Sequence, residues 1–358
     1  MNKPTLLSRI QGCLLGVRIG DAMGVPWEMY ARDQIMEETG GKGVTGFQNS
    51  KNRRFEEMRD LALGEISDDT IFTDVVVRSL IRCKGFDLGD SAREHLAAFE
   101  GPIFGMGRAT RSGLQSLKEG RDPLTPAPDM KPGKGSGNGV IMKVSGLALF
   151  HAVTHGPFSD GFKREPLFMQ VMQLGRMTHP DPRASLAAYA VARIIATVLH
   201  DPVPSPGVSP SKYDWHVDGL LGDLAQEITH IEDGLMYGVS QFSDDPLSWR
   251  LGRLSVDGDA LVYDREALRK EIGTACFALE SGPFAIGTFL LNPTNFKSGV
   301  LEAINAGGDT DSNASIVGAL IGANCGAEAI PQDWIRFNPK FQEAFGLGEA
   351  LCKAALTT

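Results

Sequence analysis

The sequence predicts an all-α fold, because helix periodicity dominates it and strand periodicity is scarce. In four segments apolar residues recur at intervals of three and four, as they do along the buried face of a helix. Few stretches alternate apolar with polar residues, and none is arranged as a βαβ unit. The 358 residues are 42% hydrophobic and 22% charged, a composition from which an ordinary globular core can form.

The segments with helix periodicity are residues 6–17, 71–80, 187–199 and 316–321. The first lies in residues 1–20, where Arg9 and Arg18 stand among apolar residues and predict an amphipathic helix rather than a signal peptide. Asp181 and Pro182 predict the start of the third helix, with a capping side chain and then a proline whose missing N–H costs nothing there. Small residues crowd the fourth segment and predict close contact with another helix.

Three long stretches are rich in glycine, proline or charge and are predicted to be irregular: residues 26–64, 121–139 and 201–211. Loops of this length inside a compact domain are usually functional or mobile. None of them looks like a linker between separate cores. We therefore expect one domain over residues 1–358.

Charge and cysteine content exclude several classes of protein. The formal net charge of −9 argues against non-specific binding of nucleic acid, which needs a basic surface. The five cysteines are widely spaced and form no CxxC pair, so neither a disulfide framework nor a structural zinc site is expected. No uncharged apolar run reaches about 18 residues, so no contact with a membrane is expected and a cytoplasmic location is the default.

Two acidic segments stand at predicted helix starts, residues 65–70 and residues 307–313. A helix cap alone would explain one acidic side chain at each start. The adjacent pair Asp68 and Asp69 exceeds that need, and in the second segment Asp309 and Asp311 follow two glycines that allow a sharp turn. If the two starts meet, four carboxylates share one site, and an all-oxygen set favours Mg²⁺, Mn²⁺ or Ca²⁺ over zinc.

Two such metal ions about 4 Å apart would clamp vicinal oxygens of a substrate. The hydroxyl groups of Ser67, Thr70 or Ser312 could complete their ligand shells. Asp21 and Glu28 lie near the end of the first helix. Asp21 is interpreted as a structural hydrogen-bonding group, whereas Glu28 by itself fits either an exposed carboxylate or a site residue.

Two glycine-rich segments, residues 104–107 and 133–139, precede predicted helices. Backbone N–H groups at such positions bind phosphate, although a flexible loop explains the composition equally well. Neither a dinucleotide fingerprint nor a Walker A loop is present. His179 stands just before the helix cap at Asp181, where it is either solvated or in contact with a ligand.

The order of these elements resembles the ADP-ribosylglycohydrolase family, which includes the dinitrogenase-reductase-activating glycohydrolases. The segments that carry the resemblance are residues 20–24 with Glu28, 67–70, 105–107, 137–139 with Met142 and Lys143, 178–179, and 307–312. The resemblance itself spans nearly the whole chain, from about residue 6 to residue 334. The two acidic motifs are specific as a pair, and the glycine motifs are individually weaker.

The resemblance implies an orthogonal helical bundle with a binuclear Mg²⁺ site, in which Mn²⁺ could replace Mg²⁺. It implies metal ligands at Ser67, Asp68, Asp69, Asp309, Asp311 and Ser312. It implies catalytic roles for Glu28, Asp69 and Asp309, with Glu28 moving a proton. It implies that the substrate is bound by Gly105, Met106, Gly107, Gly137, Asn138, Gly139 and His179.

The activity implied is hydrolysis of the bond between ADP-ribose and a protein side chain or small acceptor, so the expected partner is ADP-ribose or an ADP-ribosylated protein. Serine stands at positions 67 and 312 where many members have threonine, which keeps a hydroxyl group. Lys143 replaces a common arginine, which keeps the charge but loses the bidentate geometry. Gly105 stands where the arginine-specific branch often has aspartate, which argues against arginine-linked substrates. The sequence gives no oligomeric state.

Two other functions remain open from the sequence, and a third is disfavoured. The chain could hydrolyse a free N-riboside, or it could bind and neutralise an ADP-ribosyltransferase without turnover. Helical enzymes with paired acidic motifs also bind prenyl diphosphates, but the required DDxxD motif fails here because its last position is Phe72.

Overall fold

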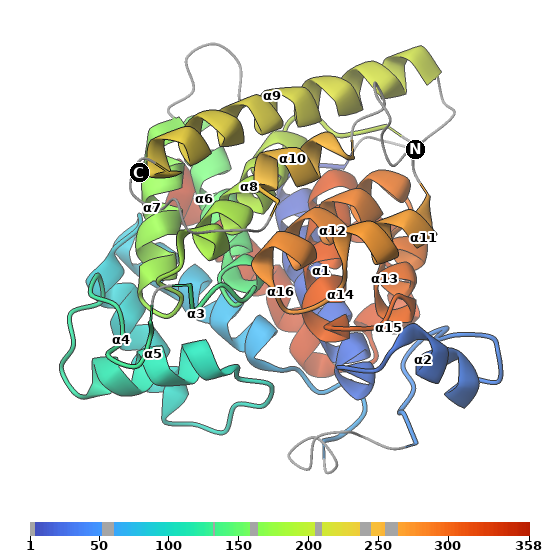
Figure 1. Ribbon diagram of the computed structural model, residues 1–358, viewed down its shortest axis with the longest axis horizontal. Coiled ribbons are helices and arrows are strands. Elements are labelled where there is room, and N and C mark those ends of the chain that lie inside the picture. Colours follow the sequence, from blue (N-terminus) through green and yellow to red (C-terminus); the bar gives the residue numbers. More distant parts are fainter. Residues whose placement is uncertain are drawn as a thin grey trace.

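The computed structural model describes residues 4–51, 61–131, 133–157, 164–204, 210–236, 245–254 and 264–358. Within these ranges the chain forms helices and no strand, so the predicted all-α class is confirmed (Figure 1). Its extended pairing there is limited to two isolated bridges, between Ala31 and Gly307 and between Gly137 and Phe277.

The α-helices are α1 (Leu6–Gly24), α2 (Arg32–Glu38), α3 (Asp68–Cys83), α4 (Leu88–Phe99), α5 (Arg108–Lys118), α6 (Ser145–His155), α7 (Arg164–Arg176), α8 (Pro182–Val198), α9 (Pro210–Met236), α10 (Leu247–Gly252), α11 (Arg265–Ala267), α12 (Ala278–Leu291), α13 (Phe296–Asn305), α14 (Thr310–Cys325), α15 (Gln332–Ile335) and α16 (Pro339–Leu356). Short 3₁₀ or π turns are η1 (Val25–Trp27), η3 (Ile141–Lys143), η4 (Leu268–Ile272) and η5 (Ala327–Ala329). The four helices predicted from periodicity correspond to α1, α3, α8 and α14. Their starts at Ser67 and Asp181 are confirmed, because both side chains accept a backbone N–H of the first turn.

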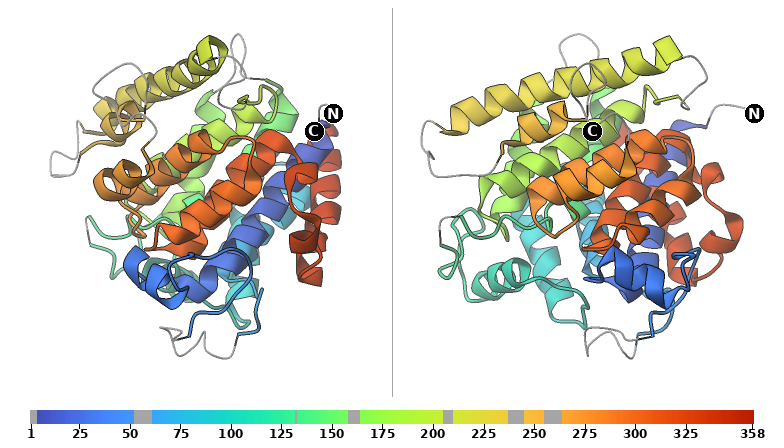
Figure 2. Two further views of the ribbon diagram at one scale, coloured as in Figure 1. Left: turned by 90° about the vertical axis from the view of Figure 1, so that its right-hand side faces the viewer. Right: turned by 45° about the vertical axis from the view of Figure 1, so that its right-hand side comes forward.

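Helices α1 and α14 run side by side through the middle of the bundle (Figure 2). Glycines at every fourth position of α1, from residue 12 to residue 24, face the small residues of α14. A Cβ atom at Gly16 would lie 2.0 Å from the carbonyl oxygen of Gly318, and one at Gly20 would lie 2.1 Å from that of Ala314. The predicted close approach of the small-residue helix is thus confirmed. This contact, the glycine seam below, brings the end of α1 against the start of α14.

The prediction that the N-terminal helix is amphipathic is wrong, because every residue of α1 from Ser8 onward is buried except the half-buried Gln11. Its two arginines are buried as well, and each has partners that replace water. The Arg18 guanidinium donates to the Leu14 carbonyl oxygen at 3.1 Å and forms an ion pair with Asp74 at 2.5 Å. A charged residue in this pattern therefore marks an internal ion pair rather than an exposed face.

The other long helices surround the α1–α14 pair. Helices α3, α6, α8, α12, α13 and α16 contribute to one apolar cluster that runs through the bundle. Helix α9 crosses over α8 and α10 on one side, whereas α2 and α5 lie at the opposite end (Figures 1 and 2). Along the described ranges, no helix has both the length and the apolar composition needed to cross a bilayer.

The predicted irregular stretches are partly wrong. Residues 26–64 contain α2, a short helix in which one residue, Ile35, is buried, so its periodicity is hidden among charged side chains. The stretch 121–139 is irregular wherever it is described. Of the stretch 201–211, residues 205–209 lie outside the described residues, and α9 already begins at Pro210.

Candidate metal and substrate site

Three helix ends meet at one end of the glycine seam: the last turn of α1 and the first turns of α3 and α14. Asp21, in the last turn of α1, accepts the backbone N–H groups of Ser67 at 3.0 Å and Thr70 at 3.1 Å. It also accepts the Thr70 hydroxyl. The interpretation of Asp21 as a structural hydrogen-bonding group is therefore confirmed. Its carboxylate fastens the start of α3 to α1.

The second acidic segment is held against the same end of α1. Gly307 and Gly308 have φ angles of 78° and 83°, which a residue with a side chain rarely adopts. A Cβ atom at Gly308 would also lie 2.4 Å from the Thr274 carbonyl oxygen, so glycine alone fits this turn. The Thr310 hydroxyl donates to the Gly24 carbonyl oxygen at 2.9 Å. As a result both acidic motifs straddle a helix start: Asp68, Asp69 and Asp311 lie in the first turns of α3 and α14, and Asp309 is the N-terminal cap of α14.

The structure places carboxylate oxygens in two groups. In each group one oxygen per residue lies within 4.8 Å of the others. The groups are Asp21, Asp69 and Asp311, and Glu28, Asp309 and Asp311. Neither group contains histidine or cysteine, so the described residues offer hard oxygen ligands there.

The other predicted metal ligands border these groups. Asp68 lines the same cavity but joins neither group, and its Oδ1 atom lies where a Cβ atom of Gly105 would collide with it at 2.6 Å. The Ser312 hydroxyl donates to Asp69 Oδ1 at 3.2 Å. The Ser67 hydroxyl accepts the Asp69 N–H at 3.3 Å and so caps α3.

Burial and mutual repulsion shift the acids toward their neutral forms. Burial, followed by the charges of Asp309, Asp68 and Asp21, raises the pKa of Glu28 to about 9. Burial and then the charges of Asp21 and Asp309 raise the pKa of Asp68 to about 8.

The pKa values of Asp69 and Asp311 are raised well above the ordinary value, first by burial and then by neighbouring carboxylates. Two oxygens in the cluster, Asp69 Oδ2 and Glu28 Oε2, are buried and receive no hydrogen bond from the described residues. Buried acceptors without donors are costly, and a divalent cation would satisfy them. The donor set therefore fits such an ion.

A cavity of about 210 Å³ opens above the carboxylates. Its lining residues are Glu28, Met29, Asp68, Asp69, Gly105, Gly107, Arg108, Ala109, Thr110, Gly137, Asn138, Gly139, Met142, His179, Cys276, Asp309, Asp311 and Ser312. All the site residues predicted from sequence line this cavity except Ser67 and Met106, which are buried beside it. The structure thus brings both acidic motifs, both glycine segments and His179 to one place.

The amide of Asn138, predicted to contact substrate, is engaged with the acidic cluster. Its Nδ2 atom donates to Asp309 Oδ2 at 2.8 Å and lies 3.1 Å from the Ser281 hydroxyl. Ser281 in turn donates to Asn313 Oδ1 at 2.7 Å, and Asn313 donates to the Thr274 carbonyl oxygen at 2.9 Å. This chain of hydrogen bonds orients Asp309.

Sequence analysis missed the segment 274–277 and Ser281. The Cys276 carbonyl oxygen accepts the Asn138 N–H at 2.9 Å, and the Thr274 carbonyl oxygen accepts the Asp309 N–H at 2.9 Å. The segment therefore links the glycine loop to the second acidic motif. Its contacts are made by backbone carbonyl groups, which leave no signal in the identity of the residues.

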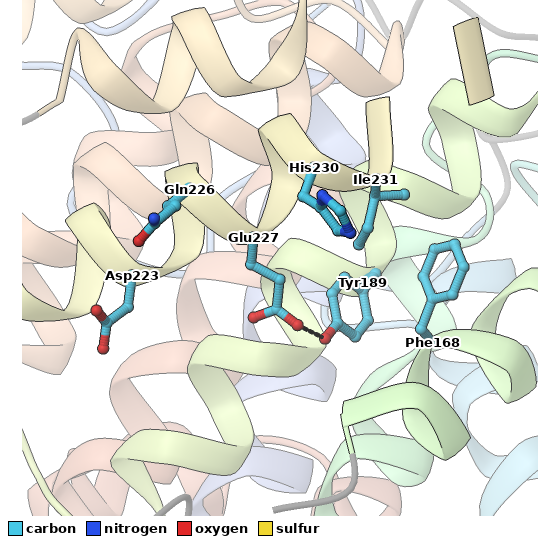
Figure 3. A pocket seen from close by; sticks show the side chains of 7 residues that line it. All are labelled: Phe168, Tyr189, Asp223, Gln226, Glu227, His230 and Ile231. Atoms are coloured by element: carbon cyan, nitrogen blue, oxygen red, sulfur yellow. Dashed lines mark hydrogen bonds between the residues drawn. The ribbon is translucent and has the colours of Figure 1, made fainter. Parts of the chain in front are cut away.

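A larger cavity, of about 610 Å³, lies away from this site, between α7, α8 and α9 (Figure 3). It is lined by Phe168, Tyr189, Asp223, Gln226, Glu227, His230 and Ile231. The Glu227 carboxylate accepts the Tyr189 hydroxyl and the Arg193 Nε at 3.3 Å, so its charge is compensated. Because this cavity contains none of the residues singled out in the sequence, the smaller one is the candidate site.

Residues 2–356 match the family described as ADP-ribosylglycohydrolase. The chain belongs to the ADP-ribosylglycohydrolase family. It is therefore an enzyme whose reaction is the hydrolysis of ADP-ribose glycosidic bonds, as the sequence resemblance implied.

Relatives within and around the ADP-ribosylglycohydrolase family align over nearly the whole chain. The mouse protein named ADP-ribosylhydrolase ARH3 is 28% identical over 96% of this chain and 91% of its own length. The ADP-ribosyl-[dinitrogen reductase] glycohydrolase of Rhodospirillum rubrum is 23% identical over 94% of this chain and 92% of its own. A solved structure titled ADP-ribosylglycohydrolase-related protein complex shares the fold, with a TM-score of 0.66, 22% identity and coverage of 98% and 99%.

Proposed function

We propose that this chain removes ADP-ribose from a protein side chain in a reaction that requires divalent cations, Mg²⁺ in the first place. The observation that carries the proposal is the convergence of two acidic helix starts beneath a cavity lined by glycine loops, where two buried carboxylate oxygens receive no hydrogen bond from the residues that the structure describes. Mg²⁺ prefers such oxygen ligands, and Mn²⁺ takes the same set.

The metal ligands in this proposal are Asp68, Asp69, Asp309 and Asp311, with the hydroxyls of Ser67 and Ser312. Asp21 belongs to one of the two oxygen groups and Glu28 to the other, and both add negative charge beside the proposed metal ligands. When bound, divalent cations act as Lewis acids that hold sugar hydroxyls and lower the pKa of water. The protein's part is to fix the carboxylates, which the contacts of Ser312 with Asp69 and of Asn138 with Asp309 accomplish.

The glycine segments suit the diphosphate and distal ribose. Gly107 is the N-terminal cap of α5, and Arg108 and Ala109, which line the cavity, carry N–H groups of the first turn that have no partner inside the helix. At Gly105, whose φ is 82°, a side chain would collide with Asp68, so the backbone itself forms the wall. Binding the diphosphate here places the ribose C1 atom over the acids, and such orientation supplies several kcal/mol.

Glu28 is the proposed proton-transfer group. Its carboxyl group is largely buried and lies in the oxygen group with Asp309 and Asp311. In the metal-free protein, burial and the neighbouring charges raise its pKa to about 9, and a bound cation would lower that pKa. A carboxyl group in this position can exchange a proton with a leaving group or with water. As the bond breaks, the ribose ring acquires oxocarbenium character, and the surrounding carboxylates stabilise the positive charge.

The shape of the cavity favours a macromolecular substrate over a free riboside. Its rim includes Met29, Gly107, Arg108 and Cys276, all of which are exposed. A site with an exposed rim admits a side chain that remains attached to a folded protein. A free N-riboside would be held more completely by a closed pocket.

The activity is tested by incubating the purified protein with proteins ADP-ribosylated on serine or on arginine, and separately with small O- and N-ribosides of ADP-ribose. Released ADP-ribose is quantified by mass spectrometry after metal removal and after addition of Mg²⁺ or Mn²⁺. We expect release from modified protein that depends on the added cation. Release from the small ribosides alone would support the riboside hydrolase instead.

The binding-protein alternative is separated by Asp68→Ala. If the chain acts by capturing an ADP-ribosyltransferase, this variant should still protect target proteins from modification. If the chain acts by turnover, protection is lost together with ADP-ribose release. Absence of turnover on every substrate, with metal bound, would end the enzymatic proposal for this chain.

Metal binding is expected to stabilise the protein more at high pH than at low pH. Without metal, the folded protein keeps the Asp68 proton up to about pH 8, whereas an unfolded aspartate loses it near pH 4. This group's stabilising contribution is thus complete below about pH 4 and is lost as the pH rises toward 8. Because Mg²⁺ requires the deprotonated form, its binding should tighten by about tenfold per pH unit for each proton released.

The measurement is the shift in melting temperature on adding MgCl₂, by differential scanning calorimetry, across this pH range. Asp69→Asn serves as the control, since its shift should be small at every pH. A shift that does not depend on pH would contradict the assignment of these acids to the metal.

A further inference from the structure

Lys143 is fully buried behind the cavity, in the η3 turn that follows the second glycine segment. Its Nζ atom lies 3.3 Å from the Thr178 hydroxyl oxygen and faces the Phe72 ring, 5.6 Å from its centroid. The Thr178 hydroxyl oxygen lies 2.9 Å from His179 Nδ1. Lys143, Thr178 and His179 therefore form one continuous chain of hydrogen bonds, from the interior to a residue that lines the cavity.

The far side of the His179 ring borders the substrate site. A Cβ atom at Gly139 would lie 2.8 Å from His179 Nε2, and one at Gly137 would lie 3.6 Å from it. Glycine at both positions lets the ring edge reach the cavity wall. Within the described part of the chain Nε2 makes no hydrogen bond, and it is not among the fully enclosed polar atoms that lack one. It is thus accessible for a ligand.

The direction of the hydrogen bonds follows from the chemistry of their ends. A lysine ammonium group has donors and no acceptor, so the Thr178 oxygen accepts from Lys143. Among the residues that the structure describes, the Thr178 proton then has one acceptor within reach, His179 Nδ1. In the opposite arrangement Nδ1 would carry a proton and donate to Thr178, and the Thr178 hydroxyl, 1% exposed, would have a buried proton with no acceptor among the described residues.

We propose that Lys143 and Thr178 are positioning residues that hold His179 in the neutral tautomer with its proton on Nε2, so that His179 donates a hydrogen bond into the substrate site. The tautomer stands on the two distances within the hydrogen-bonded chain and on the ammonium form of Lys143. The acceptor, which rests on the proposed function, is a phosphate or ribose oxygen of the ADP-ribosyl group. A substrate with a donor at this position would be rejected.

The pKa values of the two ionisable groups in this hydrogen-bonded chain agree with the proposed tautomer. Burial, aided by the charge of Lys143, lowers the pKa of His179 to about 3, so the ring is neutral and carries one proton. Burial lowers the pKa of Lys143 to about 7, against the charge of Asp68, which raises it. Below that pH the lysine is an ammonium group and acts as a donor only. His95, which stacks on Phe72, also has a pKa lowered by burial and presents no competing charge.

The tautomer is measured directly by ¹⁵N NMR of histidine-labelled protein at about pH 6, below the pKa of Lys143 and far above that of His179. The spectrum distinguishes a protonated ring nitrogen from an unprotonated one, and His179→Gln identifies the signal. We expect Nδ1 of His179 to be unprotonated and Nε2 to be protonated in the wild type and in Thr178→Ser. In Thr178→Val and Lys143→Met we expect a mixture of tautomers.

The functional consequence is measured by calorimetric titration with ADP-ribose in the presence of Mg²⁺. Loss of one hydrogen bond to an anionic ligand should weaken binding about tenfold or more in Thr178→Val, and Thr178→Ser should restore it. The matched control is Thr288→Val, since the Thr288 hydroxyl is buried in α12 and has no partner among the described residues. It should change neither the tautomer nor the affinity.

The two proposals fail in different ways. A wild-type spectrum with the proton on Nδ1, or a tautomer that is unchanged in Thr178→Val and Lys143→Met, would overturn this inference whatever the activity. If the expected tautomer is found but ADP-ribose does not bind, the hydrogen-bonded chain is confirmed and its proposed ligand is wrong. That result would overturn the proposed function instead.

Discussion

Asp69→Asn is expected to abolish turnover, with a loss of about a thousandfold or more. Asp69 lies within 4.8 Å of Asp21 and Asp311, and its Oδ2 atom is buried without a hydrogen-bond donor from the described residues. Asparagine keeps the volume and can still accept the Ser312 hydroxyl, but it removes the negative charge that a cation requires. Loss of several kcal/mol of charge stabilisation corresponds to that fall in rate.

The same variant should be at least as stable as the wild type when metal is absent. The pKa of Asp69 is raised well above its ordinary value, so the folded protein prefers the neutral acid, and an amide resembles that form. Metal content is measured by mass spectrometry, turnover by release of ADP-ribose, and stability by denaturant unfolding.

Asp33→Asn is the matched control, because Asp33 is an exposed acid on α2 outside the cavity. It should leave metal content and turnover unchanged. Full activity in Asp69→Asn would show that the carboxylate cluster is not where the cation acts.

Gly16→Ala is expected to lower the free energy of unfolding by about 3–5 kcal/mol. The added Cβ atom would lie 2.0 Å from the backbone oxygen of Gly318, a distance that no change of side-chain rotamer can relieve. Helices α1 and α14 would have to separate, and the buried packing along the seam would be lost with their contact.

Gly346→Ala in α16 is the control, because a Cβ atom there would meet nothing within 4 Å. It should be neutral or stabilising by up to about 1 kcal/mol, since alanine favours the helix. Both variants are measured by chemical denaturation followed by circular dichroism. Equal stability of the two would mean that the close contact along the seam does not exist in solution.

The helices that sequence predicted well are those in which periodicity and capping agree. Around Ser67 and Asp181 a side-chain cap, a first turn and an apolar stripe all indicate the same start. Helix α2 was missed because a single buried residue, Ile35, leaves no stripe to detect. The burial of Arg18 could not be predicted either, since its partner Asp74 is 56 residues away.

For the candidate site, the acidic motifs were visible because adjacent or alternating aspartates are unusual at a helix start. Their convergence was an expectation of the resemblance, and the structure supplies its physical basis in the glycine seam and in the contacts of Asp21. The support for Asp309 through Ser281 and Asn313 had no local signal. Each is a single polar residue on a helix, and its meaning arises only when α12 and α14 pack together.

The glycine seam also determines which parts of the interior can change without altering the spacing of the acidic side chains. Because main chain touches main chain between α1 and α14, the separation of Asp21 from Asp311 does not depend on how any intervening side chain is packed. Elsewhere in the bundle, apolar residues can be exchanged and repacked while the spacing of the acids stays constant. Substitutions in the rest of the core should therefore leave the arrangement of the acids at the helix ends unchanged.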